Sequence, residues 1–393
     1  MNFTGFELDQ LLGMGEESNP LMMLVWILPV ILFVFYGQRI QLYVTSGEIK
    51  KAIKKLDAYR SESRDELLGH LRDVTGSPQQ QQQQQQQHRP PGQANPDELA
   101  GKVSRFIDYI TIMPVDMDPS GIVPKVKHVM RTREDVTRRQ VRALAPGVAD
   151  ELQAARMQVL LEIASSLHMI HKTVNHMFLT AKRQNNYPLI LPLQMALPFV
   201  MEQAEALRNA TGAFREGHPV GDGIGPMIVG RMMRGLKKEE AALHTVLARD
   251  SYEGRSLLLL KARGPAPVVG RPADAISYIA ESGQEIHAII MIDAALKMEG
   301  EDSASVSHGF GAAIGGIGTE RYEIEEYALG AGIPIFSIVV KESVEEAVTI
   351  MTEEIAQRAD EITVQVREMI LENADEGQTV LVIGVGNTAG VAQ

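Results

Sequence analysis

The longest apolar stretch of the chain lies near its N-terminus. Residues 20–38, PLMMLVWILPVILFVFYGQ, carry no charged side chain, and a helix of this length just crosses the hydrocarbon layer of a bilayer. The pattern predicts a single transmembrane helix, which Pro29 kinks without ending. A cleaved signal peptide would need a basic start and a small-residue cleavage site, and neither is present. A buried core helix stays as the alternative.

Charges on either side of this stretch predict its orientation. The charged side chains that precede it are all acidic, whereas basic residues follow from Arg39 onward. Positive charge favours the cytoplasmic side of a membrane. We therefore expect a single-pass protein of the cell membrane, with its N-terminus outside and the bulk of the chain in the cytoplasm.

The pattern then changes along the chain. A charged amphipathic helix is expected over 41–75, a polyglutamine and proline linker over 76–96, and a helical region over 97–215. Inside that region, the apolar residues 187–201 are proline-interrupted and too few to span a membrane, so they predict a buried connection between helices. The predicted domains are 1–40 as tail and anchor, 41–75, 76–96, 97–215, and 216–393 as an α/β domain.

Short apolar runs bounded by glycine, proline or charge appear after residue 216. Helical patterns separate them, and continuous apolar strands that alternate with helices are typical of a parallel sheet covered on both faces. We expect a C-terminal three-layer α/β domain with a mainly parallel sheet, covered in part by an acidic helix over 343–373. The apolar runs are 256–262, 287–293, 333–340 and 380–385.

Composition then narrows the chemistry. The chain has no cysteine, which excludes disulfides, thiolate metal ligands and cysteine nucleophiles. Its net charge of −12 argues against a nucleic-acid partner, and a homo-oligomer stays open. One basic run in the helical region either meets anionic lipid beside the anchor or forms a solvated helix face. This run comprises Lys125, Lys127, Arg131, Arg133, Arg138, Arg139 and Arg142.

Two aspartates and one histidine stand out in the α/β region. Asp222 lies in GDGIGP at a helix start, Asp293 ends the run 287–293, and His308 begins a glycine-rich loop. Ligands of such domains collect at the carboxyl ends of the strands, so we expect these side chains to converge. Paired carboxylates whose pKa values differ do acid and base work on water, and with a histidine they can also hold a divalent metal. Each residue also has a simpler explanation, as part of a turn, a cap or a loop.

Glycines beside these residues would let a peptide or small-molecule ligand approach the backbone. The candidates for ligand binding are Gly221, Gly223, Gly225, Gly309, Gly311 and Asn387. The run 380–385 has a glycine-rich exit and is free to pair beside the helix that starts at Gly221, which would place Asn387 next to Asp222. We expect no dinucleotide site, because neither a helix nor an acidic residue follows the last glycines.

Four motifs together resemble the superfamily of germination proteases and hydrogenase maturation proteases. They are GVGN at 384–387, GDGIGP at 221–226, AIIMIDAAL at 288–296 and the block 307–351. This resemblance implies that Asp222 and Asp293 form the acid pair of a peptidase, or that such positions and a histidine surround nickel. The GxGN strand comes last here and not first, so the order looks circularly permuted. The whole chain also looks like an archaeal membrane-anchored family of unknown function, which implies no activity.

Two functions of different classes follow from these features. The first is a membrane-anchored, peptidase-like hydrolase that uses Asp222 and Asp293, with His308 assisting or binding metal. The alternative is a non-catalytic membrane scaffold or small-ligand sensor, whose glycine loops bind an anion through backbone N–H groups. Arg263 and Arg271 would suit that second role.

Overall fold

The computed structural model describes residues 20–75, 96–111, 121–145, 150–184, 187–316 and 318–392, without the side chains of 20–26, 32–42 and a few helix ends. The predicted N-terminal tail and nearly all of the polyglutamine linker lie outside these residues. The chain forms two compact units. One comprises Met1–Lys55 with Lys172–Phe199, and the other Leu56–His171 with Val200–Gln393.

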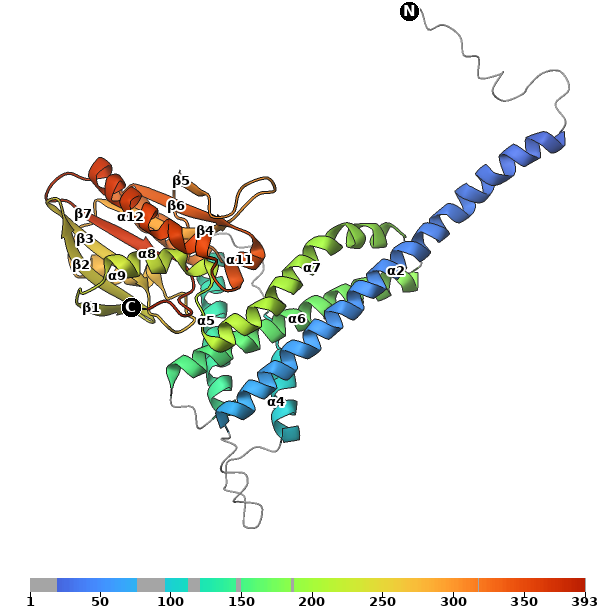
Figure 1. The fold of residues 1–393 in the computed structure, drawn as a ribbon, viewed down its shortest axis with the longest axis horizontal. Coiled ribbons are helices and arrows are strands. Elements are labelled where there is room, and N and C mark those ends of the chain that lie inside the picture. Colours follow the sequence, from blue (N-terminus) through green and yellow to red (C-terminus); the bar gives the residue numbers. More distant parts are fainter. Residues whose placement is uncertain are drawn as a thin grey trace, which may run out of the picture. The chain divides into compact units, whose positions relative to one another are not determined.

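The residues that the structure describes before residue 217 are mainly helical, and the helical prediction over 97–215 is confirmed for them. The helices are α2 Pro20–Thr75, α4 Pro96–Ile107, α5 Ile122–Leu144, α6 Glu151–Gln184 and α7 Tyr187–Glu216 (Figure 1). α2 contains Pro29 and runs past the expected domain boundary at residue 40. Within the described part of the chain, no helix is both long and apolar enough to cross a membrane. Most side chains of the predicted span, 20–38, are outside the described residues.

The start of α7 differs from its prediction as a buried connection. Ile190 and Leu193 are buried, but Met195 and Phe199 are 75% and 63% exposed. Because apolar residues occupy most positions here, they lie on all sides of the helix. Other parts of the chain pack against only one of these sides. The segment is therefore half-buried.

The α/β part contains a seven-stranded sheet in the order β1-β2-β3-β7-β4-β6-β5. Its strands are β1 Lys238–Ala242, β2 Thr245–Tyr252, β3 Arg255–Ala262, β4 Ala288–Leu296, β5 Val306–Phe310, β6 Ile335–Glu342 and β7 Thr379–Gly384. Of these seven strands, β7 comes last in the sequence. In the sheet, however, it pairs between β3 and β4, near the middle.

The sheet is mixed, which corrects the prediction of a mainly parallel one. The parallel pairs β3–β7, β7–β4 and β4–β6 join the four strands that the apolar runs predict. Antiparallel pairs β1–β2, β2–β3 and β5–β6 flank this centre. The edge strands β1 and β5 escaped prediction because KEEAA and VSHGF contain no continuous apolar run.

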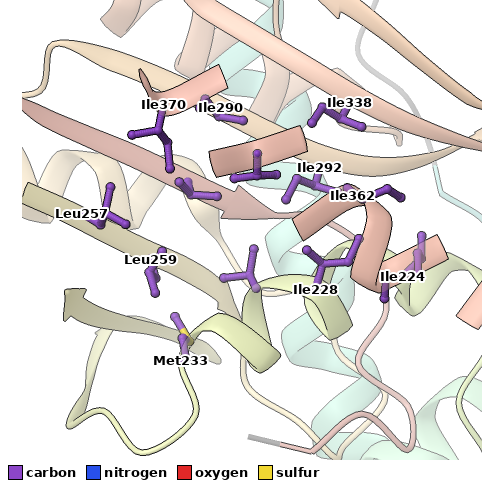
Figure 2. Packing of buried hydrophobic residues seen from close by; sticks show 14 of the residues in the cluster. Ile224, Ile228, Met233, Leu257, Leu259, Ile290, Ile292, Ile338, Ile362 and Ile370 are labelled. Atoms are coloured by element: carbon purple, nitrogen blue, oxygen red, sulfur yellow. The ribbon is translucent and has the colours of Figure 1, made fainter. Parts of the chain in front are cut away.

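Helices cover both faces of the sheet, which gives the expected three layers. α8 Ile224–Met232 and α12 Glu353–Asn373 pack on one face, where Figure 2 shows Ile228 and Ile362 among strand residues. α9 Pro272–Glu281 and α10 Thr319–Ala331 contribute buried residues to the core of the other face.

The acidic helix expected over 343–373 is interrupted. α11 Val344–Val348 ends first, and α12 begins after Thr352, whose side chain accepts a hydrogen bond from the Ile355 N–H. An N-cap of this kind marks a new helix start. As predicted, α12 buries its apolar stripe on the sheet, whereas α11 has no buried residue.

Candidate active site

Asp222 is positioned by the turn before α8 and by the loop that leaves β7. It lies in η1 Gly221–Gly223, a single 3-10 turn that runs directly into α8. The backbone N–H of Asn387 donates to Asp222 Oδ2 at 2.7 Å. Both halves of the geometric prediction are confirmed: the last apolar run inserts centrally beside this helix, and it brings Asn387 to Asp222.

Glycines at this junction let backbone segments approach one another. A Cβ on Gly225 would overlap the carbonyl oxygens of Ile292 and Val385. A Cβ on Gly223 would lie 2.8 Å from the Asn387 carbonyl oxygen, closer than real Cβ atoms come. The glycines of GDGIGP are thus required by the packing of α8 against β4 and the loop after β7. Ligand binding by the same glycines stays a prediction.

Asp293 lies where the central strand β7 has just ended, because Gly384 pairs with the preceding residue, Ile292. Its side chain is 5% exposed, and Oδ1 accepts the Ala294 N–H at 2.9 Å. Burial, and then the charge of Asp222, raise the pKa of Asp293 to about 8, although hydrogen bonds from two backbone N–H groups oppose this. Near neutral pH this carboxyl therefore holds a proton.

Asp222 is in a different balance. Burial leaves the pKa of Asp222 raised, and a single backbone hydrogen bond, from Asn387, opposes this shift. Asp222 is within electrostatic reach of Asp293, since its charge raises the pKa of that residue. The structure thus brings together the two aspartates that the sequence singled out.

The glycine-rich loop reaches this pair at a residue that the sequence did not single out. The Gly315 N–H is the second backbone donor to Asp293, and Gly315 is itself exposed. Of the predicted glycines, Gly309 belongs to β5, and the Gly311 carbonyl accepts the Ser337 hydroxyl at 2.5 Å. The loop therefore covers Asp293 from the solvent side.

His308 is held elsewhere. It lies within the edge strand β5 opposite Ile338, not in a loop as predicted, and its Nε2 is 3.0 Å from Gln365 Oε1 on α12. Among the residues that the structure describes, no group of three or more His, Asp or Glu side chains is placed to hold a metal ion. The metal alternative built from Asp222, Asp293 and His308 gains no support there.

A third acidic side chain, Glu342, was missed by the sequence reasoning. It is the last residue of β6, is fully buried, and has no hydrogen-bond partner for either carboxyl oxygen among the described residues. Burial raises its pKa to about 8, with further contributions from Asp222, Glu346 and Asp293. Its sequence surroundings, KESVEE, are typical of a solvated segment and gave no signal of burial.

The basic run on α5 forms ion pairs within its own compact unit. Lys127 Nζ lies 3.1 Å from Asp274 on α9 and 2.5 Å from Glu323 on α10. Arg131 Nη2 lies 2.6 Å from the same aspartate. This part of the run is therefore neither a free lipid-binding surface nor simply solvated.

The two arginines considered for anion binding also have acidic neighbours. Arg271 Nη2 lies 3.0 Å from Glu134 Oε2, and Arg263 Nη1 lies 3.9 Å from Glu240 Oε2. A bound anion would have to compete with these carboxylates.

Two family models match the chain. One, described as protein of unknown function (DUF1512) N-terminal domain, matches residues 23–217. The other, described as domain of unknown function (DUF1512) C-terminal, matches residues 220–392. Their boundary coincides with the end of α7 and the turn that carries Asp222. No curated protein matches the chain.

Proposed function

We propose that this chain, which belongs to the DUF1512 family, is a peptidase-like hydrolase in which Asp222 and Asp293 share acid and base work. The observation that carries the proposal is the placement of two largely buried carboxyls where central strands of the sheet end, Asp222 in η1 beside the loop after β7 and Asp293 on β4. The charge of Asp222 raises the pKa of Asp293. Two carboxyls that do not both ionise near neutral pH supply one base and one acid.

Their environments assign the roles. The charge of Asp222 raises the pKa of Asp293, so Asp222 loses its proton first and is the base that takes a proton from water, with the Asn387 N–H donating to its carboxylate. Asp293, with a pKa of about 8, is the acid that gives its proton to the carbonyl oxygen of a bound amide. The water oxygen bonds to the carbonyl carbon. When the C–N bond breaks, the amine takes the proton from Asp222, and Asp293 recovers one from a hydroxyl of the intermediate.

The test is peptide cleavage by the full chain in water enriched in ¹⁸O, with new C-termini identified by mass spectrometry. Asp222→Asn and Asp293→Asn should each lower the rate by about 10²-fold or more, since each removes an acid–base group. Asp250→Asn, which changes an exposed aspartate on β2, is the matched control and should cleave like wild type. Equal cleavage by all four proteins would refute the proposal.

Absence of cleavage of every peptide would favour the non-catalytic alternative, a scaffold or a small-ligand sensor. The described structure favours that alternative less, because Arg263 and Arg271 already face carboxylates. The acidic character of the site also disfavours an anionic ligand.

We further propose that the charge-free stretch 20–38 anchors the protein in the cell membrane, with the rest in the cytoplasm. The support is the sequence itself, because basic residues follow this stretch and acidic ones precede it. Protease added to intact cells should leave the chain after Arg39 undigested, and lysis should expose it. Digestion of this part without lysis would show that it lies outside the cell and would refute the proposed orientation.

A further inference from the structure

The strand β5 leaves one edge of the sheet open. It is the last strand of the sheet order and, within the described chain, pairs only with β6 (Figure 1). Beside this pairing, the Ser305 carbonyl accepts the Lys341 N–H at 2.8 Å, and the Gly311 N–H donates to the Ile335 carbonyl at 3.0 Å. Hydrogen-bonded positions alternate along an antiparallel pair, so the backbone groups of every second residue point away from β6. These residues are Val306, His308 and Phe310.

The opposite edge of the sheet is protected, whereas β5 is not. Proteins keep edge strands from pairing with other chains by means of charged side chains, proline and bulges. β1 has such devices, since KEEAA is rich in charge and its register with β2 shifts between Glu240 and Ala242. β5 has the sequence VSHGF, and no Lys, Arg, Asp, Glu or Pro lies between Asp302 and Glu320. This edge is therefore suited to the addition of a strand.

Phe310 gives the open edge an apolar side chain to bury. It is 90% exposed, and its ring centre lies 6.1 Å from that of Phe336. Alternate residues of a strand share one face of the sheet, so Phe310 is on the same face as His308. The contact of His308 with Gln365 shows that this is the face that α12 covers. A strand added to β5 would place alternate side chains beside Phe310, on the side of α12.

The flank of α12 next to this edge is acidic. Glu361, Glu368 and Glu372 lie four residues before, three after and seven after Gln365, so they share its side of the helix. All three are exposed. Glu361 lies 2.9 Å from Arg358, but Glu368 and Glu372 have no ion pair within the described structure. Two such flanks from two copies of the chain would repel each other, whereas lysine or arginine side chains would be attracted.

We propose that the open edge of β5 binds an extended, basic peptide segment of a partner protein, which adds a strand to the sheet. The backbone of the segment pairs with Val306, His308 and Phe310, and strand addition of this kind gains affinity from main-chain hydrogen bonds. An apolar side chain of the segment covers Phe310. Its lysine or arginine side chains meet Glu368 and Glu372, which select a basic partner.

This edge is separate from the proposed hydrolase site. Asp293 pairs with Val339 of β6, which pairs with Ser307 of β5. An added strand is therefore three strand spacings from β4, about 14 Å away. A segment that is bound here is not positioned for acid–base work by Asp293, so the inference goes beyond the proposed hydrolase and does not depend on it.

The first test measures binding of a fluorescein-labelled peptide of alternating lysine and valine to the full chain by fluorescence anisotropy. The same peptide with glutamate in place of lysine is the control. The basic peptide should bind at least about tenfold more tightly, and added salt should weaken its binding, because exposed charges select it. Equal binding of the two peptides would overturn the proposal.

The second test locates the binding with matched variants. His308→Pro removes an N–H that points away from β6 and should weaken binding about tenfold, whereas His308→Val keeps that N–H and should bind like wild type. The double variant Glu368→Gln and Glu372→Gln should weaken binding about fivefold. Its control removes two exposed glutamates away from α12, by Glu281→Gln and Glu285→Gln, and should have no effect. Loss of binding that is equal in His308→Pro and His308→Val would contradict strand addition.

Hydrogen exchange identifies the occupant of the edge. The basic peptide should slow the exchange of amides in the β5 segment, read by mass spectrometry, and leave β1 unchanged. Protection of β5 that rises with protein concentration in the absence of peptide would assign the edge to a second copy of the chain and overturn the proposal. Asp293→Asn should bind the peptide like wild type, so failure of the hydrolase proposal leaves this result intact. Protection of β1 and not of β5 would show that the inferred edge is wrong.

Discussion

Replacing Asp293 by asparagine should stabilise the protein while removing the proposed acid. The pKa of Asp293 rises from 3.8 to about 8 on folding, so between these values the folded state binds more protons than the unfolded state. The free energy of unfolding therefore falls as pH rises through this window. Stability associated with this group is fully present below the unfolded pKa and is lost by about pH 8. Asparagine has no charge to bury and escapes that loss.

The size of the effect follows from the shift. About four pKa units correspond to roughly 6 kcal/mol as an upper limit, at 1.36 kcal/mol for each unit. Two backbone N–H groups donate to Asp293, and the NH₂ of asparagine cannot replace an oxygen as acceptor, which costs about 1 kcal/mol. Coupling to Asp222 and Glu342 shares part of the remainder, so we expect a net gain of roughly 2–4 kcal/mol at pH 9.

The assay should report on the α/β part alone. Proteolysis in increasing denaturant, read by mass spectrometry of peptides from residues 220–392, gives the free energy of unfolding of that part in the full chain. The advantage of Asp293→Asn should grow by about 2 kcal/mol between pH 6 and pH 9, since most of the last two units of the shift fall there. Asp250→Asn should show no such growth. A variant that is less stable than wild type at pH 9, or a difference that is independent of pH, would refute the buried protonated carboxyl.

Two further substitutions, Gly225→Ala with Gly330→Ala as its control and Lys261→Met, test the packing of the α/β part by the same assay. Gly225→Ala should destabilise by about 3 kcal/mol or more, because its Cβ would overlap the Ile292 and Val385 carbonyls, whereas Gly330→Ala in α10 meets no atom within 4 Å and should be neutral or stabilising. Lys261 is 1% exposed, and burial lowers its pKa from 10.5 to about 8. Lys261→Met should gain about 2–3 kcal/mol at pH 7, and this gain should vanish as the pH approaches 10.5, because the folded wild type regains stability between the two pKa values. Equal effects of both glycine variants, or a gain for Lys261→Met that does not change with pH, would contradict these expectations.

The strands that were predictable share one property. Runs such as SLLLLKA and VLVIGV are apolar at nearly every position because they are buried on both faces, and this signal survives in a single sequence. β1 and β5 lie at the sheet edges, and β2 is buried only over its first half, so none of the three has a long apolar run. The prediction of a mainly parallel sheet was wrong because the sequence pattern identifies only the strands that are buried on both faces.

The site divides in the same way. Asp293 was found because it follows a continuous apolar run, and Asp222 because its glycines mark a turn before a helix. His308 was misplaced because the rule for carboxyl ends of parallel strands does not apply to β5, which runs antiparallel to β6. Glu342 gave no signal, because the burial of one glutamate inside KESVEE depends on tertiary packing over Gly221, and the local sequence does not encode it.

The place of β7 in the sheet explains how the acidic site can be tolerated at all. Buried carboxyls near one another destabilise a fold, so other interactions must stabilise the strand ends that carry this site. β7 supplies them: it pairs on both sides, with β3 and β4, and its buried side chains join the cores of both faces. The same segment then donates the Asn387 N–H to Asp222. The strand that stabilises the centre of the sheet thus also stabilises the charge on the base, so the site is complete only when the last strand in the sequence has inserted between two earlier ones.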